Sequence, residues 1–160
     1  MKLLLCCLFS FALLNSSCKK DRLPTFYFQC KVDSVLYKPD NCANCKTTEL
    51  FGDSIILFGM NVSNGGIGIA VRKQNLNQGN YNFSKLLLEN NATGSYDNTI
   101  GNPTDIFRTD SIRTGIISIT ELDKINKIIV GTFAFEAFNI PQNKIVKITE
   151  GRFRLNYRTY

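Results

Sequence analysis

The sequence predicts an all-β fold, either an antiparallel β-sandwich or a flattened barrel of about eight to ten strands. Several short segments alternate apolar and polar residues with a period of two, which is typical of half-buried strands. Clusters of Asn, Gly, Asp and Ser separate these segments, as turns between antiparallel strands do. No long linker, heptad pattern or clear repeat follows Pro24, so residues 25–160 are expected to form a single domain.

A tight hairpin is expected at the start of this domain. Apolar and polar residues alternate from Phe26 to Val32, and Cys30 falls on the apolar face. Asp33-Ser34 follows as a two-residue turn. Residues 35–37 then supply the returning strand.

The next segments predict a loop and three strands. Residues 40–53 are expected to form a polar loop. Residues 54–62 are apolar at both odd and even positions, as in a central strand covered on both faces. Residues 64–66 contain two glycines and indicate a turn into a partner strand over residues 67–71. Residues 79–83 form a further short alternating strand.

The second half of the chain passes from an irregular segment to a regular one. Residues 84–111 are rich in Asn, Gly, Asp and Thr, and the leucines at 86–88 suggest no more than a helical turn. Residues 114–122, 127–138 and 144–157 then predict three consecutive strands joined by short polar turns.

The last of these strands changes phase. Its apolar residues occupy even positions before Thr149-Glu150-Gly151 and odd positions after it. A sheet with one buried face accepts this only through an extra residue, so a β-bulge is expected there, with Gly151 in the awkward backbone conformation. The apolar residues concerned are Val146, Ile148, Phe153, Leu155 and Tyr157.

The bulge is expected to place Arg152, Arg154 and Arg158 together on the opposite face of the final strand. Such a row suits an extended anionic chain, but a charged last strand also protects a sheet edge against pairing with another chain. Both interpretations remain open from the sequence. Tyr96 and Phe107, in the irregular segment, are further candidate ligand-binding residues.

Residues 1–17 have the features of a bacterial lipoprotein signal peptide. A basic start and an apolar stretch too short for a stable spanning helix precede small residues and Cys18. We expect Cys18 to become the acylated first residue of the mature chain, carrying palmitate-type chains, with residues 18–24 as a tether. Asn15 occupies a place where such signals usually have an apolar residue, and a plain secretory peptide is the alternative.

An outer-membrane location follows from the residues around the lipidation site. Lys19 resembles the residue found there in outer-membrane lipoproteins, which predicts a lipid-anchored protein on the periplasmic face or the cell surface. Removal of residues 1–17 takes away one lysine and no acid, so the formal charge falls from +6 to +5. This mild excess comes without a Lys/Arg cluster or nucleic-acid motif, so a nucleic-acid partner is not expected.

Composition excludes several chemistries. The chain contains no histidine, which rules out Ser-His-Asp and Cys-His catalysis and His-ligated zinc. It contains no tryptophan, which weakens a sugar-stacking platform. The acids are scattered in turn-like positions, so we expect no enzyme, no catalytic residue, no cofactor and no metal site.

The cysteines predict a disulfide. Cys42 and Cys45 have the spacing of a redox motif, but no helical periodicity follows them, and Cys30 alone could join them in a metal site. Thiols oxidise outside the cytoplasm. We therefore expect Cys30 to be bonded to Cys42 or Cys45, in preference to the strained short loop between the latter two.

Five segments resemble a known family, namely Phe28–Asp33, Gly79–Tyr81, Gly115–Asp123, Gly131–Phe135 and Val146–Phe153. They are similar to segments of a family of small Gram-negative outer-membrane lipoproteins known only as domains of unknown function. The resemblance implies an antiparallel β fold and an envelope location, and it brings no catalytic residues.

Two kinds of binding function are compatible with these observations. The first is a non-catalytic module that binds a glycan, a lipid or another envelope protein while a lipid anchor holds it to the membrane. The second is a calycin-like barrel that carries a small apolar molecule inside.

Overall fold

The computed structural model describes residues 26–41, 45–62, 65–99, 101–113 and 115–160. The predicted signal peptide, Cys18, the tether and Cys42 lie outside these residues. The described residues form twelve strands and one short 3-10 helix, Pro103–Asp105. The strands are β1 (Tyr27–Val32), β2 (Val35–Tyr37), β3 (Lys46–Phe51), β4 (Ser54–Asn61), β5 (Gly65–Arg72), β6 (Gly79–Phe83), β7 (Asn91–Asp97), β8 (Ile106–Arg108), β9 (Gly115–Asp123), β10 (Ile128–Asn139), β11 (Lys144–Asn156) and β12 (Arg158–Thr159).

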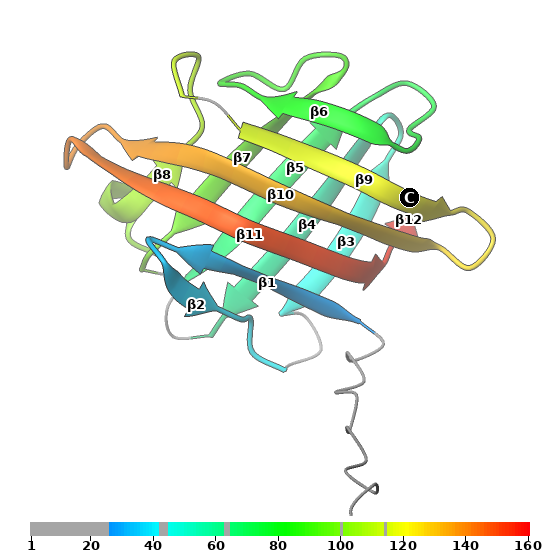
Figure 1. Cartoon of the computed structure of the whole chain (residues 1–160), viewed down its shortest axis with the longest axis horizontal. Coiled ribbons are helices and arrows are strands. Elements are labelled where there is room, and N and C mark those ends of the chain that lie inside the picture. Colours follow the sequence, from blue (N-terminus) through cyan, green and yellow to red (C-terminus); the bar gives the residue numbers. More distant parts are fainter. Residues whose placement is uncertain (1–25, 42–44, 63–64, 100, 114) are drawn as a thin grey trace, which may run out of the picture.

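The strands form one continuous sheet that folds over on itself into two layers. The hydrogen-bonded order is β12-β3-β4-β5-β7-β6-β9-β10-β11-β1-β2. In Figure 1, β6, β9, β10, β11, β1 and β2 form the front layer, and β3, β4, β5 and β7 cross behind them at a steep angle. β8 pairs with both β7 and β10, which closes a circuit of β7, β6, β9, β10 and β8. The predicted all-β architecture is confirmed.

Aromatic side chains fill the space between the layers. Phe133 lies 5.2 Å from Phe28 and 6.3 Å from Phe153, centroid to centroid, and the rings of Phe83 and Phe135 are 4.6 Å apart. All five are buried within the same apolar cluster. Their packing provides dispersion contacts and removes a large apolar area from water, which is the main source of stability in a domain of this size.

The hairpin and the bulge are confirmed, with one correction. Asp33 and Ser34 both have positive φ, as in the tight turns whose twist suits a two-residue hairpin. The pairing of β11 shifts between Ile148 and Gly151 against β10, and between Thr149 and Arg152 against β1. The residue with the left-handed backbone is Glu150, at φ 52°, and not Gly151 as predicted.

Several element predictions were wrong. β3 lies inside residues 40–53, and β7 and β8 lie inside residues 84–111, because both segments pair with distant strands that local composition does not reveal. The leucines at 86–88 form no helix. The outer face of β4 is only partly covered, so β4 is not buried on both faces.

The edges of the sheet are not where the sequence placed them. β12 and β2 end the strand order, whereas β11 lies between β10 and β1. Arginines on β11 therefore do not protect an edge strand. None of the described residues forms a helix of the length and apolarity that a membrane crossing requires.

Candidate functional site

The structure separates the three predicted arginines. Arg152 and Arg154 lie on β11 and face outward from the front layer, whereas the chain turns at Tyr157 and places Arg158 on β12 in the rear layer. Arg158 pairs in register with Glu49 of β3. The expected row of three on one strand is therefore wrong.

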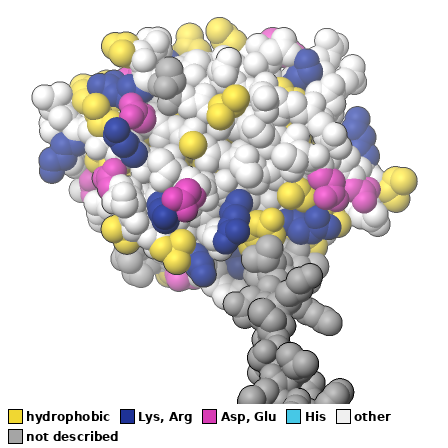
Figure 2. All heavy atoms as spheres, viewed as in Figure 1, with side chains coloured by type: hydrophobic (Ala, Val, Ile, Leu, Met, Phe, Trp, Pro, Cys, Tyr) yellow, Lys and Arg dark blue, Asp and Glu magenta, His cyan; other side chains and the backbone are white. Residues whose placement is uncertain are grey.

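The outer face of the front layer holds cations that already have partners. Arg154 Nη1 lies 3.2 Å from Glu121 Oε2, and Lys31 Nζ lies 2.6 Å from Glu150 Oε1. Figure 2 shows basic and acidic side chains beside one another on this face, among largely neutral polar atoms. Such exposed pairs contribute little stability and leave little free charge for a ligand.

Arg152 on the same face is also engaged. With the amide oriented to satisfy both groups, the Gln29 side-chain oxygen accepts hydrogen bonds from Nε and Nη2 of Arg152, at 2.7 and 2.6 Å.

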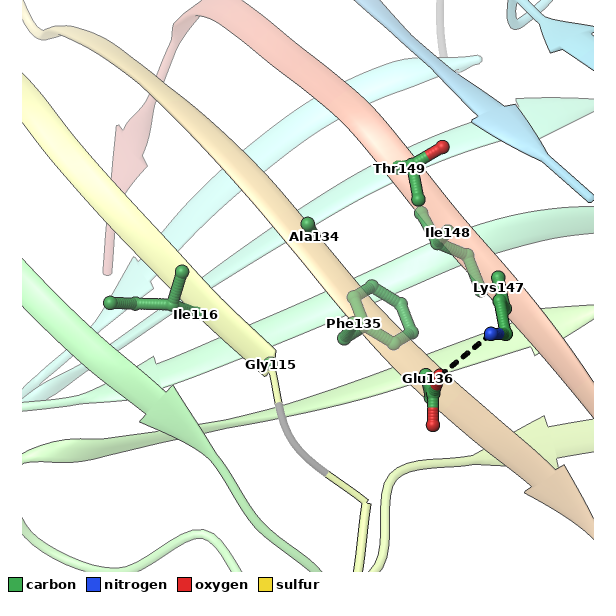
Figure 3. A pocket seen from close by; sticks show the side chains of 8 residues that line it. All are labelled: Gly115, Ile116, Ala134, Phe135, Glu136, Lys147, Ile148 and Thr149. Carbon is green, nitrogen blue, oxygen red and sulfur yellow. Dashed lines mark ion pairs between the residues drawn. The ribbon is translucent and has the colours of Figure 1, made fainter. Parts of the chain in front are cut away.

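A shallow depression occupies the same face between β9, β10 and β11. Ile116 and Ala134 lie within it, and the ion pair of Lys147 with Glu136, 3.4 Å between Nζ and Oε1, lies at one side (Figure 3). Its volume is about 390 Å³. Since the charged residues among its described lining pair with each other, it has the features of a packing irregularity more than those of a binding site.

Tyr96 and Phe107 belong to the core rather than to a binding loop. They are 9% and 4% exposed, and their ring centroids lie 6.0 Å apart. The Tyr96 hydroxyl donates to Asn98 Oδ1 at 2.9 Å. Their sequence neighbourhood looked irregular, but β7 and β8 point both rings inward.

Cys30 is a free thiol, 1% exposed, within the apolar core. The predicted disulfide from Cys30 to Cys42 or Cys45 is therefore wrong. Burial raises the pKa of the Cys30 thiol to about 12, because the thiolate would have to be stabilised without water. Cys45 is buried immediately before β3.

A larger concavity lies where the two layers part, between β3 and the end of β11. We call it the β3–β11 cleft; its volume is about 680 Å³. Its lining residues are Phe26, Asn41, Lys46, Thr47, Thr48, Glu49, Lys127, Leu155, Asn156, Tyr157, Arg158 and Thr159. Of the predicted site residues, the cleft contains Arg158.

The cleft has an excess of positive charge. Lys46, Lys127 and Arg158 line it together with a single described acid, Glu49. Lys46 Nζ donates to Asn41 Oδ1 and Lys127 Nζ to Thr159 Oγ1, both at 3.3 Å. Among the described residues no ion pair involves any of the three cations. They are therefore available to an anionic group.

The cleft also contains an unsatisfied polar atom. The Thr48 side chain is 2% exposed, and its hydroxyl has no hydrogen-bond partner among the described groups. A buried hydroxyl without a partner costs ~1–3 kcal/mol, so such an atom beside a cavity marks a place where a ligand or water gains a hydrogen bond. Nearby, burial raises the pKa of the Tyr157 hydroxyl, which stays protonated near neutral pH.

Sequence reasoning missed Lys46, Thr48 and Lys127 as site residues. Lys46 and Thr48 lie in the segment predicted as loop, and Lys127 belongs to the turn between β9 and β10. The alternation over Lys46–Phe51 is weak, and the only available signal was the run of β-branched Thr47 and Thr48.

Comparison with known proteins places the chain in a family. Residues 24–155 match the family described as "Domain of unknown function (DUF6252)", and the chain belongs to this family. No curated protein and no solved structure matches it. The family description assigns no activity.

Proposed function

We propose that the chain is a non-catalytic binding module of the cell envelope, held at the outer membrane by a lipid on Cys18, and that it receives an anionic group in the β3–β11 cleft. The observation that carries the proposal is the cluster of Lys46, Lys127 and Arg158, three cations without acidic partners among the described residues. Cations that converge on a concave surface attract and orient anionic ligands.

The chemistry of the cleft favours binding over catalysis. The chain has no histidine, and Glu49 is the one carboxylate among the described lining residues. Glycoside hydrolysis by carboxylates needs two of them at a defined separation. The lysines and arginine supply charge and hydrogen-bond donors, which is sufficient for recognition.

The packed interior counts against the alternative of a barrel that carries an apolar ligand. The rings of Phe28, Phe133 and Phe153 occupy the space between the layers in which such a ligand would have to lie. A carrier barrel needs an interior large enough to hold its ligand. We therefore do not propose that alternative.

The described chain begins beside the cleft. Phe26, the first described residue, lines the cleft, and β1 starts at the next residue. A tether over residues 18–24 would therefore reach the domain beside the cleft. A lipid on Cys18 would then hold the cleft within a short chain length of the membrane surface.

A matched pair of triple variants tests the proposal. The cleft variant is Lys46→Ser, Lys127→Asn and Arg158→Ser, where asparagine suits the positive φ of Lys127. The control removes three exposed lysines outside the cleft, Lys85, Lys124 and Lys144, so both variants lose the same charge.

Two anionic probes serve as ligands, a fluorescent oligogalacturonate and a fluorescent acidic peptide. We expect salt-sensitive binding of at least one probe, weakened about tenfold or more in the cleft variant and nearly unchanged in the control. Equal loss in both variants, or no binding of either probe to the natural chain, would refute the proposal.

A further inference from the structure

The cleft follows the backbone edge of β3 and not merely one face of it. Four consecutive residues, Lys46 to Glu49, line the cleft. Successive side chains of a strand point to opposite faces, so a surface touched by all four runs along the edge. β12 pairs with β3 only at Glu49 and Leu50, which leaves the first half of this edge without a neighbouring strand among the described residues.

The hydrogen-bond pattern shows which backbone groups face this edge. Cys45 O accepts from Met60 N at 2.8 Å on the β4 side, whereas Leu50 O accepts from Tyr160 N at 3.2 Å on the β12 side. Hydrogen bonding alternates along a strand, so odd-numbered residues of β3 bond to β4 and even-numbered residues face away from it. Lys46 therefore directs its N–H and C=O, and Thr48 its N–H, towards the cleft.

The opposite wall of the cleft is likewise a strand edge to which no other described strand pairs. β1 pairs with β11 from Tyr27 and Arg154 onward, so Leu155 and Asn156 extend beyond the start of β1. They pair with β10 on their other side. Among the described residues the cleft is thus a seam between the layers, with a strand edge on each side whose backbone groups an additional extended chain can pair with.

Charge indicates which kind of chain fits this seam. Lys46 lies on the edge of β3 that faces the cleft, and Lys127 and Arg158 are also among the residues that line it. A neutral or basic peptide would leave these three cations without a partner, whereas an acidic one would pair with them. The Thr48 hydroxyl, buried and unpartnered, lies on the same stretch of β3.

We propose that an extended acidic segment of a partner protein docks in the β3–β11 cleft by adding as a strand to the free edge of β3, beside Lys46 and Thr48. Strand addition of this kind takes its affinity from main-chain hydrogen bonds and its specificity from alternate side chains. This inference rests on the proposed function, since it names the chemical class of the anionic ligand.

Backbone methylation of a peptide probe tests the inference directly. The probe is a fluorescent peptide of alternating Glu and Val, compared with two counterparts that carry N-methyl groups on the Glu residues or on the Val residues. Alternate N–H groups of a strand point to opposite sides, so only one of the two methylated peptides loses the donors that face β3. A one-residue slip cannot restore them, because it moves the glutamates to the other face.

We expect the mature chain to bind the unmethylated peptide and one methylated peptide with similar affinity, and to bind the other about tenfold or more weakly. Hydrogen exchange supplies a second readout. The amides of Lys46 and Thr48 should become protected in the complex, whereas those of the exposed residues Lys124 and Lys144 should not.

Other outcomes separate the inference from the proposed function. Binding of oligogalacturonate without binding of the peptide overturns strand addition and keeps the anionic cleft. Equal affinity for both methylated peptides, without protection of the Lys46 and Thr48 amides, also overturns it, because side-chain charge alone would then explain binding. If neither probe binds, both proposals fail.

Discussion

Gly151 lies directly against Phe133, so closely that a Cβ atom on Gly151 would stand 2.5 Å from both the ring Cδ2 and the backbone oxygen of Phe133. The glycine is needed for this contact, while Glu150 next to it adopts the left-handed backbone of the bulge. Glu150 thus has the backbone conformation that the sequence predicted for Gly151, and Gly151 makes a close contact that the sequence did not predict.

Gly151→Ala should lower the free energy of unfolding by about 1–3 kcal/mol, because the added methyl group displaces the Phe133 ring or the paired strand. Glu150→Asn should change it by no more than ~0.5 kcal/mol, since asparagine tolerates the positive φ and the exposed ion pair with Lys31 contributes little. Urea denaturation measures both. The reverse order of effects would contradict the assignment of roles.

Thr48→Val should leave the domain as stable as the natural chain or raise its stability by up to about 1 kcal/mol. Valine has nearly the same shape, and it removes a buried hydroxyl that has no partner in the described structure. Thr47→Val is the control on the same strand, because Thr47 is only partly buried. A loss of more than about 1 kcal/mol in Thr48→Val would show that the hydroxyl has a partner in solution.

The Cys30 thiol should resist modification in the folded protein. At pH 8 a thiol with a pKa of about 12 is almost entirely protonated, and the side chain is enclosed by the core. Iodoacetamide followed by peptide mass spectrometry should label Cys30 only after denaturation. Rapid labelling at native conditions would contradict this burial.

Alkaline pH should destabilise the domain partly through Cys30. Its folded pKa is raised, so above the unfolded value of about 9 the unfolded chain loses its thiol proton first, and stability falls as pH rises towards 12. Cys30→Ala should show a weaker decline over this interval, after its lower overall stability is subtracted. If stability declined with pH as steeply in Cys30→Ala as in the natural chain, Cys30 would not be a cause of the alkaline destabilisation.

Asp105 should stabilise the domain at neutral pH and lose this contribution in acid. Hydrogen bonds from Thr99, Gln142 and Asn98 lower the pKa of its carboxyl group. A depressed folded pKa means that the stabilisation is complete above the unfolded pKa, near 4, and disappears as pH falls through the folded value. Asp105→Asn should therefore reduce Tm at neutral pH, and the Tm of this variant should fall less steeply than that of the natural chain as the pH is lowered.

Cys18 should be the acylated first residue of the mature protein. Mass spectrometry of the mature N-terminus, before and after removal of ester-linked chains, should find a lipid-modified Cys18, and Cys18→Ser should release the protein from the membrane fraction. A mature chain that begins elsewhere without modification would refute the lipoprotein assignment.

The hairpin of Asp33-Ser34, the meander of β9, β10 and β11 and the bulge before Gly151 were predictable from sequence. Each is encoded by residues close together in the chain, through period-two alternation, turn residues and a phase change. Burial of Phe153 and exposure of Arg152 follow from the same local pattern.

Tertiary structure alone decided which cations meet. The chain turns at Tyr157 to the rear layer, so the backbone of Arg158 pairs with that of Glu49 on β3 and lies on a different strand from Arg152. Lys46, at the start of β3, and Lys127, in the turn between β9 and β10, line the same cleft. That the described part of the chain leaves the first half of the β3 edge without a neighbouring strand was decided in the same way, because it depends on where β12 stops pairing. Contacts between residues so distant in sequence depend on packing of the layers, which leaves no periodic signal in any one segment.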